Sequence, residues 1–209
     1  MEMKIEKFVL GPVGTNCYIV RNEDTMECFI VDMAACPPEL VSHIKNAGLT
    51  AKAVLLTHGH FDHIMGLDRF LEEFPVQVYA CGAEKELLEN AQMNTSAGML
   101  GQPYTFTGAQ FVKDGDLLQI AGMNIQVIQT PGHTIGGCCY YIAEEKVLFS
   151  GDTLFRASVG RTDLPTGSMG ALVRSVKERI LVLPDETRVY PGHMEETTVG
   201  YEKKYNPFL

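Results

Sequence analysis

The stretch LLTHGHFDH, residues 55–63, decides how the rest of the sequence is interpreted. Three of the six histidines in the chain, together with one aspartate, fall within six consecutive positions at the end of an apolar run. On an extended chain His58 and His60 project to the same side, because side chains alternate, whereas on a helix they would point about 200° apart. The pair is therefore predicted to lie in a loop at the end of a strand.

Three further strand-like runs end in residues of the same kind. IQVIQT leads into Pro131-Gly132-His133, KVLFS into Gly151-Asp152, and RVY into Pro191-Gly192-His193. Strand ends in a layered α/β fold converge on one edge, so residues that are distant in sequence can meet there. The sequence therefore predicts one site built from four strand ends.

The residue types at these strand ends predict a site for two metal ions. The donors divide into a first set, a second set and one bridging carboxylate: His58, His60 and His133; Asp62, His63 and His193; and Asp152. Imidazole nitrogens and carboxylate oxygens, without a thiolate, suit zinc best and leave a position open for water; iron and manganese are also compatible. Asp62 and Asp152 are the predicted catalytic residues, acting through the metals. Backbone carbonyls and Thr57, Thr130 or Thr134 are expected to orient the imidazoles.

Other polar residues are interpreted without a role in this site. His43 lies beside Val41 and Ile44 on an expected helix and is interpreted as an ordinary core or surface residue. Cys138 and Cys139 are adjacent in an expected strand and must face opposite ways, so core packing is expected for them. The remaining aspartates of interest are interpreted as caps, turn residues or solvated charges: Asp68, Asp114, Asp116 and Asp163.

Composition limits the possible partners and location. With 209 residues, 45% of them hydrophobic, the chain is expected to form a single domain over residues 1–209. A formal charge of -9 argues against nucleic acid and anionic membranes as partners, and favours a small-molecule substrate. The six scattered cysteines form no C-x-x-C pair, and neither a signal peptide nor an apolar run of membrane-spanning length is recognisable. We therefore expect a cytoplasmic protein with reduced thiols.

Hydrophobic patterning predicts an α/β fold. The first residues alternate as an antiparallel meander, and a helix is expected over residues 38–47. Strands and helices then alternate over residues 53–57, 64–74, 76–80 and 87–91. The C-terminal part is expected to contain strands joined mostly by hairpins, then a helix and a last strand: 117–120, 123–129, 137–142, 146–150, 168–180 and 187–190. Residues 94–104 are expected to be a surface loop, either a plain connection or a border of the substrate entrance.

Four motifs together resemble the metallo-β-lactamase superfamily, and within it the glyoxalase II-like hydrolases, also called hydroxyacylglutathione hydrolase-like enzymes. They are THGHFDH (57–63), TPGHT (130–134), SGDTLF (150–155) and YPGH (190–193). The resemblance covers essentially the whole chain. It implies a single-domain, four-layer αββα sandwich with a two-metal site at one edge of the sheets, and it assigns the seven donors to the same sets.

The resemblance also implies a reaction, the hydrolysis of a thioester such as S-lactoylglutathione or a related activated acyl substrate by a hydroxide shared between two metals. A thiolate leaves readily, so such a substrate needs no strong general acid. Glutathione thioesterases of the family carry a basic residue after SGDTLF that contacts the substrate, and Arg161 stands there; a surface pair with Asp163 is an equal alternative. The family's additional C-terminal helical segment for glutathione is not expected in this chain.

Two alternative activities use the same scaffold. A mononuclear iron persulfide dioxygenase would use His58, His133 and Asp152, and residues 160–163 read GRTD as in such enzymes. A lactonase or another ester hydrolase is the second alternative. A secreted β-lactamase is disfavoured, because the signal peptide and an uncharged or cysteine-containing second site are both missing.

Overall fold

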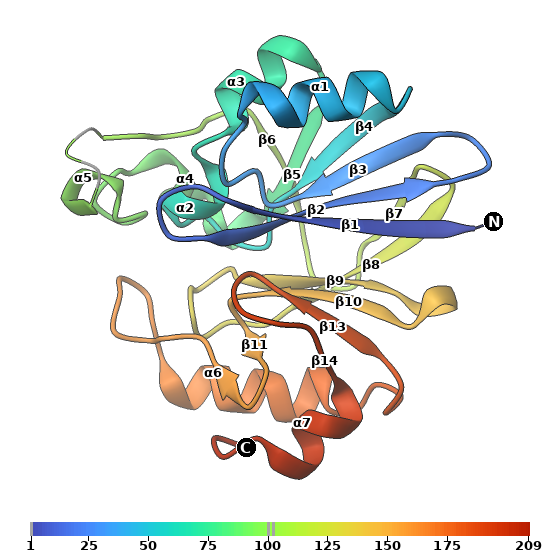
Figure 1. Cartoon of the computed structure of the whole chain (residues 1–209). Helices are drawn as coiled ribbons and strands as arrows, with labels where there is room; N and C mark the ends of the chain where they lie inside the picture. Colours follow the sequence, from blue (N-terminus) through green and yellow to red (C-terminus); the bar gives the residue numbers. More distant parts are fainter. Residues whose placement is uncertain (1, 100, 102) are drawn as a thin grey trace.

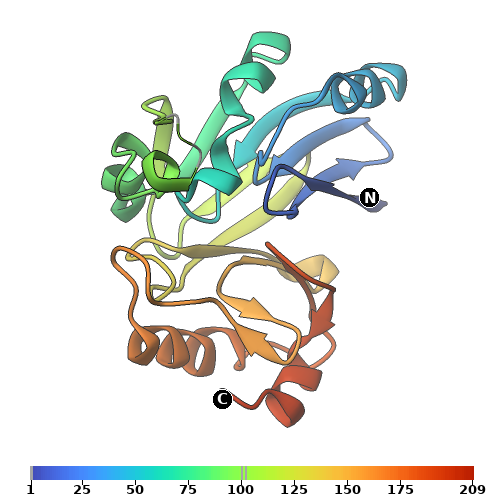
Figure 2. The ribbon, with the colours of Figure 1, turned by 60° about the vertical axis from the view of Figure 1, so that its left-hand side comes forward.

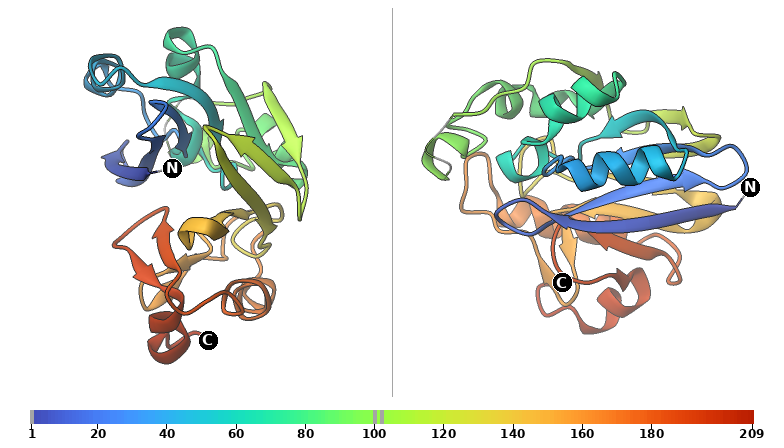
Figure 3. Two further views of the ribbon diagram at one scale, coloured as in Figure 1. Left: turned by 90° about the vertical axis from the view of Figure 1, so that its right-hand side faces the viewer. Right: turned by 45° about the horizontal axis from the view of Figure 1, so that its top comes forward.

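Two mixed β-sheets stacked face to face form the centre of the molecule, and helices cover their outer faces (Figure 1). The coordinates are a computed structural model that describes residues 2–99, 101 and 103–209. Figures 2 and 3 show the same division from other sides, with the blue-to-green half of the chain in one layer pair and the orange-to-red half in the other.

The first sheet begins as a meander and continues with parallel strands. Its strand order is that of the sequence: β1 (Met3–Leu10), β2 (Thr15–Asn22), β3 (Glu27–Val31), β4 (Thr50–Leu55), β5 (Gln77–Cys81) and β6 (Ala109–Val112). The pairings of β1 with β2 and of β2 with β3 are antiparallel, and those from β3 to β6 are parallel. Parallel strands need crossovers, and the intervening helices provide them.

The second sheet is mostly antiparallel. Its order is β14 (Thr197–Thr198), β13 (Arg188–Pro191), β10 (Val147–Gly151), β9 (Cys138–Ile142), β8 (Met123–Gln129) and β7 (Leu117–Ile120). Only the pairing of β10 with β13 is parallel, so both of these strands deliver their C-terminal ends to the same edge. A separate small hairpin, β11 (Leu154–Phe155) and β12 (Ser158–Val159), follows β10.

Most helices are short. Those of the first half are α1 (Pro38–Asn46), α2 (Phe61–Ile64), α3 (Leu67–Glu73), the 3-10 helix η1 (Gly82–Glu84), α4 (Lys85–Glu89) and α5 (Ser96–Met99). The second half has the 3-10 turn η2 (Ala143–Glu145), α6 (Met169–Ser175), the π-helical turn η3 (Val176–Ile180) and α7 (Val199–Tyr205). In Figure 1, α1 and α3 lie on the first sheet and α6 and α7 beneath the second.

Three buried layers hold these elements together. Alternation along β2 sends Tyr18 and Val20 into the core between the sheets, and sends Ile19 toward the helices of the first half. A third cluster packs Leu172 of α6 against the outer face of the second sheet. Three apolar layers between four layers of secondary structure confirm the predicted αββα sandwich and single domain.

The structure corrects several predicted elements. The helix expected over residues 64–74 is two helices, because the backbone at Gly66 packs so closely on Ala35 that a Cβ would lie 2.6 Å from its carbonyl carbon. The strands β6, β11, β12 and β14 and the helix α7 were not predicted. The expected helix over 168–180 is α6 continued by η3, and the hydroxyl of Ser168 caps it by accepting a bond from the Ala171 N–H.

Candidate metal centre

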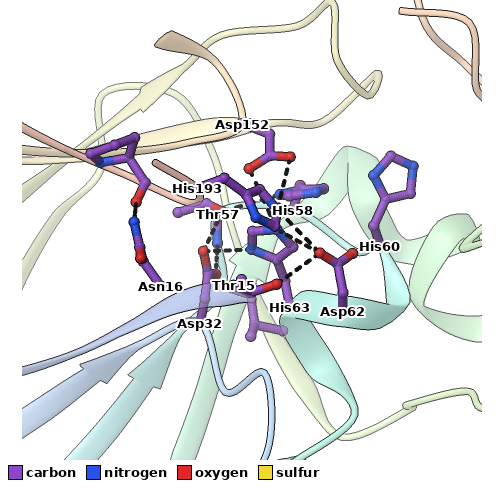
Figure 4. A network of polar contacts seen from close by, with 12 residues as sticks. Thr15, Asn16, Asp32, Thr57, His58, His60, Asp62, His63, Asp152 and His193 are labelled. Atoms are coloured by element: carbon purple, nitrogen blue, oxygen red, sulfur yellow. Dashed lines mark hydrogen bonds and ion pairs between the residues drawn. The ribbon is translucent and has the colours of Figure 1, made fainter. Parts of the chain in front are cut away.

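All seven predicted donors lie together where strand ends of both sheets meet. Figure 4 labels all of them except His133. His58 and His60 stand between β4 and α2, and α2 itself carries Asp62 and His63. The second sheet supplies the other three from the ends of β8, β10 and β13: His133, Asp152 and His193. Each sheet therefore contributes only part of the cluster.

The first set forms a tight group of imidazoles. One ring nitrogen from each of His58, His60 and His133 lies within 4.8 Å of the other two. Nδ1 of His60 is 2.9 Å from Nε2 of His133. Buried nitrogens that face one another in this way are suited to hold a common cation.

The second set groups one carboxylate with two imidazoles. One ligand atom from each of Asp62, His63 and His193 likewise lies within 4.8 Å of the other two. Oδ2 of Asp62 is 3.2 Å from Nε2 of His193 and 3.5 Å from Nε2 of His63. The hydroxyl of Thr15 donates to the same oxygen at 2.8 Å and fixes the carboxylate.

Asp152 faces both sets. Its Oδ1 is 3.4 Å from Nε2 of His63, and its Oδ2 is 3.6 Å from Nε2 of both His133 and His193. A carboxylate whose oxygens lie near nitrogens of both sets is placed to be shared between them. Oδ1 of Asp152 and Nε2 of His58 are buried and have no hydrogen-bond partner among the described residues, so a cation fits this donor set.

Hydrogen bonds on the far side of the rings select which nitrogen points into the site. Nδ1 of His58 donates to the Thr57 hydroxyl at 3.1 Å, because that hydroxyl itself donates to Asp32. Nδ1 of His133 donates to the backbone carbonyl of Arg161 at 2.7 Å. In both rings Nε2 keeps its lone pair for a metal. The expected orienting roles of Thr57 and of a backbone carbonyl are confirmed.

Thr130 and Thr134 do not orient an imidazole. The Thr130 hydroxyl pairs with that of Thr153 at 2.8 Å, and the Thr134 hydroxyl acts on the buried carboxyl of Glu84, whose pKa it lowers against the larger effect of burial. Both side chains are buried.

Asp32 is a site residue that the sequence analysis missed. Its carboxylate is buried, accepts from the Thr57 N–H at 2.8 Å and from the Thr57 hydroxyl at 2.7 Å, and lies 2.9 Å from Nδ1 of His63. It directs Nε2 of His63 into the second set. Asp32 directly follows β3, so the rule that identified Asp152, an acid at the end of a buried strand, would have found it.

Burial and mutual repulsion keep His58 and His60 of the first set neutral. Burial, reinforced by the neighbouring imidazoles, lowers the pKa of His58 well below its usual value. Burial and the ring of His133 lower the pKa of His60 to about 3. A neutral imidazole is the form that binds metal, so these rings need not lose a proton on binding.

In the second set, nearby carboxylates outweigh the effect of burial on the pKa of His63. Burial disfavours the charged ring of His63, but the carboxylates led by Asp62 and Asp32 outweigh it and raise the pKa of His63 to about 10. Burial likewise opposes the charge of Asp62, but the His63 ring beside it holds the pKa of Asp62 well below its ordinary value. A cation that binds this set must therefore displace a proton from His63.

Two glycines allow the backbone to approach Asp152. A Cβ at Gly160 would lie 1.9 Å from the backbone oxygen of Asp152, and one at Gly192 would lie 2.3 Å from Oδ1 of Asp152. Contacts this short are impossible for a real side chain, so only glycine permits the packing at these positions.

A cleft of about 110 Å³ opens over the donors. Besides five of the donors, its walls are formed by Val13, Phe61, Thr95, Met99, Arg161 and Leu164. Thr95 and Met99 belong to the predicted loop 94–104, which therefore borders the entrance and contains the short helix α5; residues 100 and 102 lie outside the described residues. The exposed guanidinium of Arg161 makes two 2.7 Å bonds to Asp163, so the predicted surface pair is present at the cleft.

The structure places the remaining candidates away from the donors. His43 packs its ring on Phe8 and lies 3.4 Å from Glu6. Cys138 and Cys139 are buried in different apolar clusters, on opposite faces of β9. Asp114 accepts a hydrogen bond from Arg179 and Asp116 one from the backbone N–H of Lys113. Among the described residues, no helix has the length and apolar character needed to cross a bilayer.

Relatives of known sequence share the length of this chain. A relative named "Probable metallo-hydrolase YqgX", from Bacillus subtilis, is 38% identical over 99% of this chain and 98% of its own length. Hydroxyacylglutathione hydrolase GloC of Haemophilus influenzae is 32% identical, with 99% of this chain and 98% of the relative covered.

Solved structures agree in fold. The crystal structure of the B3 metallo-beta-lactamase BLEG-1 matches with a TM-score of 0.93 and 39% identity, covering 99% of both chains. TTHA1623, solved in a di-iron-bound form, matches with a TM-score of 0.86 and 36% identity, covering 98% of this chain and all of its own. The profile of the Metallo-beta-lactamase superfamily matches residues 10–193, from the end of β1 to the last donor, His193. This chain belongs to the metallo-beta-lactamase superfamily.

Proposed function

We propose that the protein is a binuclear metallo-hydrolase that cleaves a thioester. The convergence of seven donors in two sets around Asp152 is the observation that carries this proposal. The first set would hold one ion and the second set the other, with Asp152 shared. Zinc is the metal that the nitrogen-rich donor set favours, whereas the di-iron-bound relative supports iron as the alternative.

Two divalent ions held there would lower the pKa of a shared water to about 7 and so supply hydroxide at neutral pH. Residues of this chain orient the metal ligands through hydrogen bonds. Asp32 fixes the imidazole of His63, Thr57 fixes that of His58, and Thr15 fixes the carboxylate of Asp62. Apolar Val13, Phe61, Met99 and Leu164 shield the cleft from water. Asp62 and Asp152 are the proposed catalytic carboxylates, because Asp62 lies against the imidazoles of the second set and Asp152 against imidazoles of both sets.

The composition of the cleft supports a substrate with a good leaving group, such as a thioester. Apart from the donors, the described side chains that line the cleft are apolar residues, one threonine and Arg161, so no acid stands ready to protonate a leaving group. A thiolate leaves without protonation because thiol pKa values lie near about 8.5. The GloC relative, named as a hydroxyacylglutathione hydrolase, supports the same choice.

The similarity to BLEG-1 makes β-lactam hydrolysis the second candidate. Opening a β-lactam releases an amine, which leaves poorly unless it receives a proton. Because no proton donor besides the donor set lines the described cleft, we rank this activity below thioester hydrolysis. A chromogenic cephalosporin tests it directly.

We further propose a cytoplasmic protein that acts on small molecules and binds neither nucleic acid nor membranes. All six cysteines are unpaired thiols, which supports a reducing compartment. The formal charge of -9 supports the exclusion of polyanionic partners.

The purified protein is expected to contain two metal ions per chain and to hydrolyse S-lactoylglutathione or another thioester of a small panel. Chelation should abolish hydrolysis, and added zinc should restore it, because hydroxide formation depends on the ions. Metal analysis measures the number of ions per chain, and release of free thiol measures hydrolysis of the thioester. One iron per chain with oxygen consumption would instead support the dioxygenase, and hydrolysis of lactones alone would support the ester hydrolase.

Arg161 allows a test of glutathione recognition. If its guanidinium binds a glutathione carboxylate, Arg161→Met should raise KM for S-lactoylglutathione by about 10-fold, the value of one charge-assisted hydrogen bond. The matched substrate S-lactoyl-N-acetylcysteamine has no carboxylate, so its kinetics should stay unchanged. The His133 bond to the Arg161 carbonyl survives the substitution, since it involves the backbone. Equal changes for both substrates would rule out carboxylate recognition.

A further inference from the structure

Glu84 is a buried carboxylate outside the metal cluster. It is the last residue of η1, its side chain is fully buried, and none of the described lysines or arginines forms an ion pair with it. Burying a charge without a counter-charge is costly unless hydrogen bonds compensate. The groups that bind Glu84 therefore indicate what the residue does.

Both oxygens of Glu84 accept backbone hydrogen bonds from loops that carry first-set donors. The Gly59 N–H donates to Oε2 at 2.7 Å, and Gly59 stands between His58 and His60. The Gly136 N–H donates to Oε1, also at 2.7 Å, three residues after His133. The first loop follows a strand of one sheet and the second joins two strands of the other. One side chain thus connects the two sheets beside the first set.

The two loops are shaped for this contact. A Cβ at Gly136 would lie 2.5 Å from the backbone nitrogen of Glu84 and 2.8 Å from Oε1, and a Cβ at Gly59 would lie 3.2 Å from Oε2. Side chains at either position would push the loops away from the carboxylate.

We propose that Glu84 is a positioning residue: by binding both loops it sets the spacing of His58, His60 and His133, and so the affinity of the first set for its ion. The proposal rests on the proposed metal site. Its two backbone hydrogen bonds go to loops that carry first-set ligands, so the larger effect is expected on the first set.

The arrangement requires a carboxylate. Each oxygen receives an N–H, whereas an amide would direct its own NH₂ at one of the two donors and lose that bond. Glu84→Gln therefore changes one atom and breaks one loop contact. Glu84→Asp keeps the charge but withdraws both oxygens by one methylene, so it separates positioning from the electrostatic effect of a nearby anion.

Competition between full-length zinc-loaded protein and a chromophoric chelator tests the proposal. His193→Ala removes a ligand of the second set and keeps all three of the first; His58→Ala removes a ligand of the first set and keeps all three of the second. In the His193→Ala background, Glu84→Gln and Glu84→Asp should each weaken zinc binding by about 10- to 100-fold, the usual effect of losing a group that orients a ligand. In the His58→Ala background the same two substitutions should weaken zinc binding by less than about 3-fold. Glu86→Gln, on the exposed side of α4, is the matched control and should change neither value.

Amide hydrogen exchange provides a readout that does not depend on metal. Exchange at Gly59 and Gly136 should accelerate in Glu84→Gln, because the bonds that protect these amides are lost or weakened. The proposal would be overturned if the Glu84 substitutions weakened zinc binding equally in the His193→Ala and His58→Ala backgrounds. It would also be overturned if they did not weaken zinc binding in the His193→Ala background. If Glu84→Gln does not fold, Glu84→Asp decides by the same comparison. An unsubstituted protein that holds no zinc would refute the proposed metal site instead, and the exchange experiment would still report on the loop contacts.

Discussion

Asp152→Ala should lose hydrolysis by more than about 100-fold, because even groups that merely orient a metal ligand cost about 10- to 100-fold when removed. The carboxylate lies between the two sets, 3.4 to 3.6 Å from three of their nitrogens. Alanine would remove a carboxylate that lies against both ligand sets and would be shared by the ions they hold. Metal content should fall together with thiol release, measured on the same preparation.

Asp185→Ala is the matched control for this substitution. Asp185 is exposed and pairs with Lys203, on the far side of the second sheet from the cluster. Its replacement should leave both readouts unchanged. If Asp152→Ala retains two ions and its activity, Asp152 does not bridge the two sets.

Asp32→Ala should lower the free energy of unfolding more than the other substitutions proposed for this protein. It leaves the Thr57 N–H, the Thr57 hydroxyl and Nδ1 of His63 without their buried acceptor. At about 1 kcal/mol or more for each donor, the free energy of unfolding falls by at least about 3 kcal/mol. For a domain of this size that corresponds to a Tm lower by about 6 to 12 °C. Alanine also fits poorly at the left-handed backbone of Asp32, which has a φ of 58°.

The measurement is thermal unfolding of the chelated protein, so that bound metal does not contribute to Tm. Asp32→Asn is the informative comparison, because it keeps the shape, tolerates the same backbone conformation and retains one acceptor oxygen. It should lose less stability than Asp32→Ala. A Tm for Asp32→Ala within about 2 °C of the parent would contradict the stabilising role.

The sequence alone identified the seven side chains that the structure brings together, because their signal is local. Five of them follow a strand end, four directly after glycine, and strand ends of a layered fold gather at one edge. The same reasoning, applied to β3, would have found Asp32. The meander, α1 and the central strands were predictable because their periodic patterns extend over five residues or more.

Other features depend on contacts that no local pattern contains. Two-residue strands such as β11 and β14 are too short to show an alternation. The break at Gly66 results from its packing on Ala35, which is distant in sequence. Glu84 has the appearance of an ordinary acid at the start of a helix; its burial and its role arise only when two loops close over it.

The order of the donors along the chain determines the order in which the two ligand sets are completed during protein synthesis. A growing chain on the ribosome completes the trio of His58, His60 and His133 sixty residues before it reaches His193. The first trio is thus available as a ligand set while the second still lacks a member. The second set is complete only after β13 has inserted beside β10.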